Sequence, residues 1–182
     1  MQVPRTLPQG SSILPEVRNA IAIASAKGGV GKSTLCINLA LSLAKTGARV
    51  GLLDADIYGP SVPLMMGVRE QPELTSENRM LPIVAQGVAL MSVGFIANEE
   101  TPVVWRGPLL AQAVQHFLGQ VEWGELDYLL IDMPPGTGDI PLTLSQAVAL
   151  SGVVVVTTPQ EVALEDVERG IAMFERALEI EP

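Results

Sequence analysis

Residues 20–34 read AIAIASAKGGVGKST, an apolar run followed by a glycine-rich turn. The run is almost entirely apolar, which predicts a strand buried on both faces of a sheet. A helix is predicted from residue 33 to about residue 45, with Gly47 in the position of a left-handed cap. A strand, a glycine-rich turn and a helix in this order are the setting in which phosphate-binding loops occur.

The turn fits the P-loop pattern G-x-x-x-x-G-K-[ST], except that Ala26 stands where the pattern begins with glycine. Its glycines let successive backbone N–H groups turn inward and hold phosphate oxygens at a helix N-terminus. Lys32 is expected to contact the β- and γ-phosphates, and the Ser33 hydroxyl to bind Mg²⁺. We therefore predict a site for ATP with Mg²⁺. The residues expected to line it are Ala26, Lys27, Gly28, Gly29, Val30, Gly31, Lys32, Ser33 and Thr34.

A second lysine, Lys27, makes this loop unusual. It sits beside the phosphates but is expected to point away from its own cradle. Such a lysine serves the chemistry only if another nucleotide comes near it, as it would in a face-to-face dimer. The alternative is a solvated surface lysine. We predict that Lys27 and Lys32 are both catalytic residues.

Carboxylates follow two other predicted strands. Asp132 ends the apolar strand at residues 128–132, as a Walker B carboxylate does, and is expected to hold the Mg²⁺ shell through water. Asp54 and Asp56 end the strand at residues 49–54, where open α/β sheets gather ligands. One of the two could lie near the Mg²⁺ shell, and we assign Asp56 to the attacking water because Asp54 lies nearer the strand. Capping and turn formation before Gly59 remain open as an alternative.

The rest of the chain alternates short apolar runs with amphipathic stretches, which predicts a three-layer α/β fold with a mainly parallel sheet and helices on both faces. Residues 20–25 are expected to lie centrally. Residues 152–157 predict another buried strand, and residues 81–83 and 88–93 predict a hairpin. Helices are predicted at 109–118, 139–149 and 161–178, with residues 60–78 mostly loop and containing at most a short helix. We expect a linker or flexible arm at 1–19 and one ATPase domain at 20–182, incomplete at its C-terminus.

Composition narrows the classes of function. The chain is 48% hydrophobic and 17% charged, as globular proteins are, and its net charge of −9 argues against nucleic acid or an anionic membrane as the main partner. No apolar run approaches the roughly 20 residues that span a bilayer, and no secretory signal is visible, so we expect a cytoplasmic protein. Cys36 is the only cysteine and His116 the only histidine. We expect both to be structural, with Cys36 a small buried hydrophobe.

Three motifs in order resemble the Mrp/ApbC family of iron–sulfur cluster carrier ATPases, within the MinD/ParA group of deviant Walker A proteins. They are KGGVGKST at 27–34, DADIYGPS at 54–61 and DMPPGTGD at 132–139. WRGP at 105–108 and TTPQ at 157–160 look like further family motifs, so the resemblance runs from about Ala20 to the end. It implies a homodimer that encloses two ATP molecules, with Lys27 reaching the partner's nucleotide and Asp56 handling the hydrolytic water. It also implies a carrier that receives a [4Fe–4S] cluster from donor proteins and delivers it to apo-proteins.

The chain departs from that family in having no Cys-x-x-Cys pair, so it contains no iron–sulfur ligands. We expect the cluster only in a full-length family member, of which this chain would be a part. Two other readings stay open. A MinD/ParA-like positioning or partition ATPase would need a C-terminal amphipathic helix or a basic patch. A nucleotide-responsive interaction module would show negligible turnover.

Overall fold

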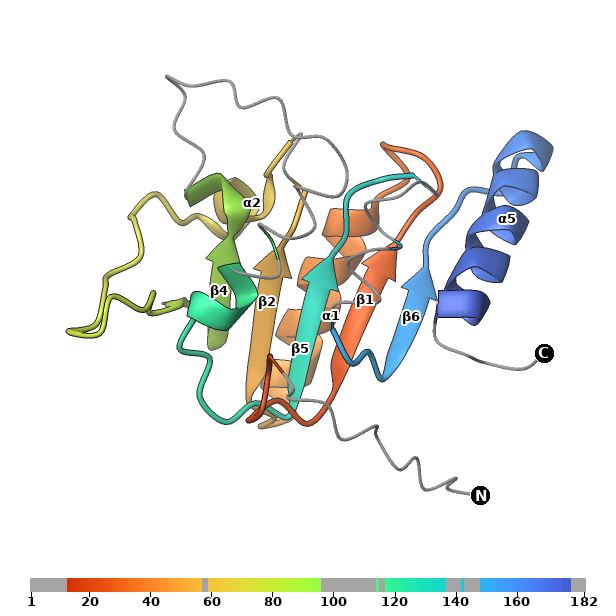
Figure 1. The fold of residues 1–182 in the computed structure, drawn as a ribbon. Coiled ribbons are helices and arrows are strands. Elements are labelled where there is room, and N and C mark those ends of the chain that lie inside the picture. The colour runs from red at the N-terminus through yellow and green to blue at the C-terminus, as the bar shows by residue number, and fades with distance from the viewer. Residues whose placement is uncertain are drawn as a thin grey trace, which may run out of the picture.

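The computed structural model describes residues 13–56, 59–95, 114, 117–136, 142 and 148–177. Within them, six strands form one sheet in the order β3-β4-β2-β5-β1-β6 (Figure 1). Neighbouring strands are parallel except for the antiparallel β3–β4 pair. The strands are β1 (Ala20–Ala24), β2 (Val50–Asp54), β3 (Ile83–Ala85), β4 (Val88–Ser92), β5 (Tyr128–Asp132) and β6 (Gly152–Val155). The predicted α/β class with a mainly parallel sheet is confirmed.

Three helices have defined bounds: α1 (Lys32–Lys45), α2 (Val62–Met66) and α5 (Glu161–Ala177). In Figure 1, α1 lies behind the sheet and α5 stands beside β6. A 3₁₀ turn, Val93–Phe95, follows β4, and residues 117–120 form a further helical turn. No helix among the described residues is long and apolar enough to cross a membrane.

The core has two halves, one on each face of the sheet. Successive strand residues point to opposite faces, so Ile23 and Leu52 pack with Cys36 of α1 on one side. Leu53 packs with Phe117 on the other side. All five of these side chains are buried. The sheet is therefore covered on both faces, as the three-layer prediction requires.

The two strands predicted from apolar runs at 20–25 and 152–157 differ in position. β1 pairs with β5 on one side and β6 on the other, so its central place is confirmed. By contrast, β6 is an edge strand of the described sheet, and its Val154 is 37% exposed. The strand predicted at residues 152–157 is therefore present as β6, but the prediction that it is buried is wrong. An apolar run indicates a strand, but it does not fix how many neighbours that strand has.

The predicted hairpin is present at the opposite edge of the sheet. β3 and β4 are joined by Gln86 and Gly87, whose φ angles are 52° and 81°. Two successive residues in the left-handed region define the tight turn that matches the twist of a hairpin. The short helix α2, which Gly67 caps, lies in the segment 60–78 predicted to be mostly loop.

The N-terminal segment packs on the domain where the structure describes it. Leu14 is buried in the core, and the Arg18 backbone N–H donates to the Leu126 carbonyl over 3.0 Å. Val17 forms an isolated bridge with Leu126. Residues 13–19, part of the segment expected to be a linker or flexible arm, thus pack against the core through Leu14 and Val17. Residues 1–12 lie outside the described residues, as do most of the helices predicted at 109–118 and 139–149.

Candidate nucleotide-binding site

The loop between β1 and α1 is shaped as an open cradle. Gly29 and Gly31 have φ angles of 78° and 93°, a backbone conformation that only glycine adopts at low cost. A Cβ added at Gly28, Gly29 or Gly31 would meet no atom of the described residues within 4 Å, so none of them crowds this side of the loop. The loop's base is tied down, since the Ser25 hydroxyl donates to the Lys27 carbonyl over 2.9 Å.

The N-terminus of α1 has no side-chain cap and no acidic residue in its own first turn. The N-cap is Gly31, which supplies no side chain. The partial positive charge of these backbone N–H groups is therefore available to an anion. Because the helix begins directly after the glycine-rich turn, the anion that fits best is one with several acceptor oxygens, such as a phosphate chain.

Lys32 is paired inside its own chain. Its Nζ lies 2.7 Å from Asp132 Oδ1, and both side chains are buried. The same Nζ lies 3.5 Å from the Ser33 hydroxyl. Burial raises the pKa of the Asp132 carboxyl, and the Lys32 ammonium and the Ser33 hydroxyl counteract that rise. The lysine and the strand-end carboxylate predicted from separate motifs therefore meet at one point.

The second oxygen of Asp132 is the feature that fits a cation. Asp132 Oδ2 is buried and has no hydrogen-bond partner among the residues that the structure describes. An orphaned buried carboxylate oxygen is costly unless water or a cation satisfies it. Among the described residues there is no group of three or more His, Cys, Asp or Glu side chains that could hold a metal by themselves. A cation here would need further ligands, and Mg²⁺ commonly takes one or two protein oxygens together with phosphate and water.

Asp54 is engaged by its own surroundings. Its Oδ1 accepts the Asp56 N–H over 3.1 Å, and its Oδ2 accepts the Val62 N–H over 3.1 Å and the Ser92 hydroxyl over 3.2 Å. Burial raises the pKa of Asp54 to about 6, against these hydrogen bonds. Asp54 thus fixes the turn after β2 and the start of α2. The alternative that the sequence left open, a role in capping and turn formation, therefore holds for Asp54.

Asp56 follows that turn and is partly exposed. Its charge is among the causes that raise the pKa of Asp132, so the two carboxylates are close enough to sense one another. Its assignment to the attacking water stays a prediction. The segment 137–139 and residues 57–58 of the motifs lie outside the described residues, as do His116 and residues 105–108.

Lys27 has partners on α5. Its Nζ lies 2.9 Å from Asp166 Oδ2 and 3.4 Å from the Val162 carbonyl oxygen. The side chains of Lys27 and Asp166 are 43% and 31% exposed. Sequence reasoning missed Asp166 and Ser92, because neither belongs to a recognisable motif. Cys36 is fully buried, and burial raises the pKa of its thiol well above the ordinary value, as expected for a structural cysteine.

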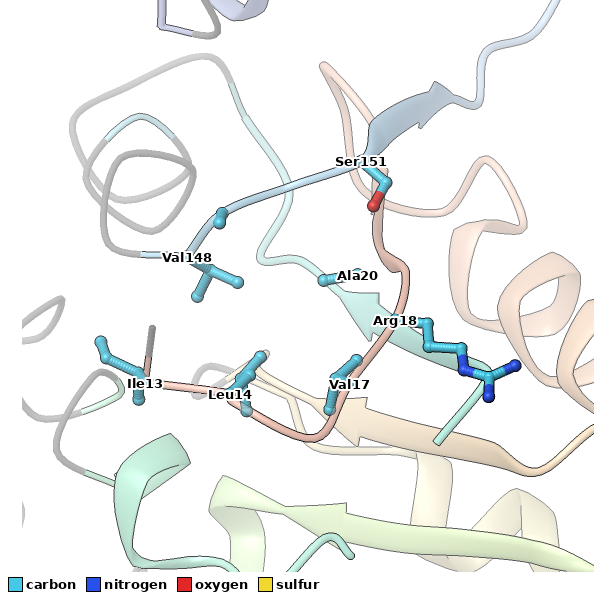
Figure 2. Close-up of a pocket in the computed structure, with 8 residues that line it drawn as sticks. Ile13, Leu14, Val17, Arg18, Ala20, Val148 and Ser151 are labelled. Atoms are coloured by element: carbon cyan, nitrogen blue, oxygen red, sulfur yellow. The ribbon is translucent and has the colours of Figure 1, made fainter. Parts of the chain in front are cut away.

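The small cavity in Figure 2 lies elsewhere. It has a volume of about 40 Å³ and lies at the N-terminal ends of β1 and β6, between Leu14, Ala20 and Val148. The phosphate loop follows the opposite end of β1. The Arg18 side chain points away from the other labelled side chains in Figure 2 and pairs with Asp127 at 3.1 Å. The cavity has room for little more than solvent.

This fold and this loop define a P-loop NTPase of the MinD/ParA kind. The family model described as ParA, NUBPL iron-transfer P-loop NTPase, matches residues 16–180. The chain therefore belongs to the NUBPL iron-transfer P-loop NTPase family.

The curated relatives with similar sequences are named as iron–sulfur cluster carrier or transfer proteins. The chain is 55% identical over 161 residues to the iron–sulfur cluster carrier protein of Haemophilus influenzae, covering 88% of this chain and 44% of that protein. It is 52% identical over 162 residues to the mouse iron–sulfur cluster transfer protein NUBPL, covering 88% and 51%. The chain thus spans about half the length of these relatives.

Solved structures agree on the fold. A nucleotide-binding protein from Archaeoglobus fulgidus, solved in complex with ADP, superposes with a TM-score of 0.78 at 44% identity. That match covers 90% of this chain and 64% of the other. The cell division ATPase MinD of Pyrococcus furiosus superposes with a TM-score of 0.65 at 21% identity, covering 88% and 68%. This second likeness supports the fold alone.

Proposed function

We propose that this chain is the ATP-binding and ATP-hydrolysing part of an iron–sulfur cluster carrier, which works as a homodimer and delivers [4Fe–4S] clusters to apo-proteins in the cytoplasm. The observation that carries the nucleotide part is the buried Lys32–Asp132 pair beside an uncapped helix N-terminus. The names of the relatives, at more than half identity, support the carrier part.

Binding follows from the loop. The backbone N–H groups at the start of α1 and the Lys32 ammonium are the donors for phosphate oxygens. The Ser33 hydroxyl and Asp132 are the residues that would hold Mg²⁺, whose charge would help neutralise the phosphate chain. Asp132 Oδ2, buried without a partner, is the oxygen suited to that task.

Hydrolysis needs a placed water and an extra positive charge. Asp56 is the carboxylate we assign to orienting the water that attacks the γ-phosphorus, while the bond to the β-phosphate oxygen breaks and ADP leaves. We assign to Lys27 the extra positive charge, which it would supply to the nucleotide bound by a second copy of the chain. Positive charge supplied in trans during phosphoryl transfer can be worth about 10³-fold or more in rate.

The cluster is cargo and needs ligands that this sequence does not supply. A [4Fe–4S] cluster is normally held by four cysteine thiolates, and Cys36 is the only cysteine and is buried. Cluster binding is therefore proposed for a longer family member, with cluster donors and apo-proteins as partners. The positioning or partition ATPase is supported by likeness of fold alone, and the outward residues of α5 include several acidic side chains that would repel an anionic membrane or DNA.

The test compares Lys27→Ala with the wild type. Lys45→Ala is the control, because it removes an exposed lysine from α1 that has no assigned role. Nucleotide affinity is measured by titration, and the dimer fraction by sedimentation with a non-hydrolysable ATP analogue. We expect Lys27→Ala to keep ATP binding, because Lys32 and the backbone cradle remain, and to lose turnover and ATP-dependent dimerisation together. Lys45→Ala should behave as the wild type. If Lys27→Ala dimerises and hydrolyses ATP normally, the two-copy mechanism is wrong.

A further inference from the structure

Helix α5 holds the Lys27 ammonium on its own chain. The contacts are the Asp166 carboxylate at 2.9 Å and the Val162 carbonyl at 3.4 Å, both near the start of the helix. The ammonium donates a hydrogen bond to the Val162 carbonyl and forms an ion pair with Asp166, so both contacts hold it against α5. To reach a phosphate on a second copy, Lys27 must give up at least part of this arrangement.

Asp166 has a second cation beside it. Its other oxygen, Oδ1, lies 3.4 Å from Arg169 NH1 one turn further along α5. When Lys27 leaves, Asp166 keeps this neighbour and a partly solvated position, so the carboxylate is not stranded. Separating Lys27 from α5 therefore costs little free energy. The contact favours the position of Lys27 on its own chain but does not prevent it from leaving.

We infer that Asp166 is a positioning residue for Lys27, which retains the ammonium on its own chain and so limits how readily two nucleotide-bound copies associate. This inference rests on the proposed role of Lys27 in the dimer. It assigns to α5, which carries no phosphate-binding motif, a direct influence on the affinity of one copy for another.

The size of the effect follows from exposure. Both side chains are partly exposed, at 43% and 31%, so the pair is screened by solvent. Ion pairs of this kind change an equilibrium by about twofold to fivefold. A two-fold dimer contains two such pairs, so their combined removal should lower the dimer dissociation constant by roughly fourfold to 25-fold.

The experiment compares Asp166→Asn, Asp166→Glu and Glu165→Gln in the full chain. Glu165→Gln removes one charge from the same helix at a residue whose side chain makes no ion pair among the described residues. Sedimentation with a non-hydrolysable ATP analogue gives the dimer dissociation constant, and titration gives nucleotide affinity. We expect the dimer dissociation constant to fall for Asp166→Asn only. Asp166→Glu keeps the carboxylate and should dimerise as the wild type does. Nucleotide affinity should be the same in all variants.

Two further measurements separate this role from a general change of charge. In a Lys27→Ala background, Asp166→Asn should no longer tighten the dimer. In the nucleotide-free chain, brief acylation read by mass spectrometry should label Lys27 faster in Asp166→Asn, with Lys45 as the internal reference. Faster labelling reports loss of the contact itself and does not depend on dimerisation.

The outcomes distinguish the inference from the proposed function. Unchanged labelling of Lys27, a weaker or equal dimer in Asp166→Asn, or a gain that persists without Lys27 would each overturn the role of Asp166. Faster labelling with no nucleotide-dependent dimer in any variant would show that the contact exists but that the homodimer proposal, and with it this role, is wrong.

Discussion

Asp54 on β2 lies opposite Asp132 on β5 in the strand register, yet the two carboxylates have different surroundings. Asp54 accepts hydrogen bonds from two backbone N–H groups and from Ser92. Asp132 pairs with Lys32 through one oxygen and leaves the other without a partner. One carboxylate therefore builds the end of the sheet, and the other is available to ligands.

Lys32→Ala should abolish nucleotide binding and also destabilise the chain. The change removes a charge-assisted contact to phosphate and leaves the buried Asp132 without its cation, which costs about 3–5 kcal/mol when one partner of a buried pair is lost. Calorimetric titration with ATP and urea unfolding measure the two effects. Lys32→Ala with Asp132→Asn should regain much of the stability but no nucleotide binding. Equal ATP affinity in Lys32→Ala and wild type would contradict the site.

Asp132→Ala should chiefly weaken the dependence of nucleotide binding on Mg²⁺. The backbone cradle and Lys32 remain, so binding of the nucleotide in the presence of a chelator should change less than binding in the presence of Mg²⁺. Paired titrations under the two conditions give the ratio. If the ratio for Asp132→Ala matches that of the wild type, Asp132 has no part in holding the cation.

The pH dependence of stability should carry the signature of Asp54. Its pKa is raised from 3.8 to about 6 in the folded chain. Between these values the folded chain keeps a proton that the unfolded chain has lost, so the contribution of Asp54 to the free energy of unfolding falls as pH rises from about 4 to about 6. The fall is on the order of 3 kcal/mol.

The measurement is urea unfolding of wild type and Asp54→Asn without nucleotide, at several pH values across this window. The wild type should lose stability relative to Asp54→Asn as the pH rises, because the amide does not titrate. A difference between the two that is constant with pH would show that Asp54 titrates as an ordinary carboxyl.

No stable [4Fe–4S] cluster should form on this 182-residue chain. Cys36 is alone and fully buried, and even a two-fold dimer would offer only two such thiols where four are normally needed. Anaerobic reconstitution with iron and sulfide, followed by desalting and iron determination, gives the stoichiometry. Cys36→Ala is the control and should retain equally little iron. A brown chromophore with stoichiometric iron on the wild type alone would overturn this expectation.

Much of the fold was predictable from local patterns. The central strand β1, helix α1 and strand β5 each combine a strong apolar pattern with a clear end signal, and the β3–β4 hairpin has a glycine in its turn. The edge position of β6 within the described sheet was not predictable, because the burial of a strand depends on neighbours that are distant in sequence.

The features of the candidate site likewise fall into those that the sequence predicts and those that it does not. Lys32 and Ser33 belong to one contiguous motif, and Asp132 stands at a strand end, so each could be named in advance. The hydrogen bonds of Asp54 come from Val62 and Ser92, which lie in segments without a motif. The pairing of Lys27 with Asp166 depends on where α5 packs, and no local pattern encodes that position.

The buried contact between Lys32 and Asp132 also gives this site a selectivity for what it binds. Asp132 is fully buried, and within the described part of the chain its charge is balanced by the Lys32 ammonium. An anion that draws Lys32 toward itself leaves Asp132 short of positive charge, unless a cation arrives with the anion. The site should therefore bind an anion that is accompanied by a metal cation more tightly than the same anion without one. By thermodynamic reciprocity, each member of such an incoming pair strengthens the binding of the other by the same factor.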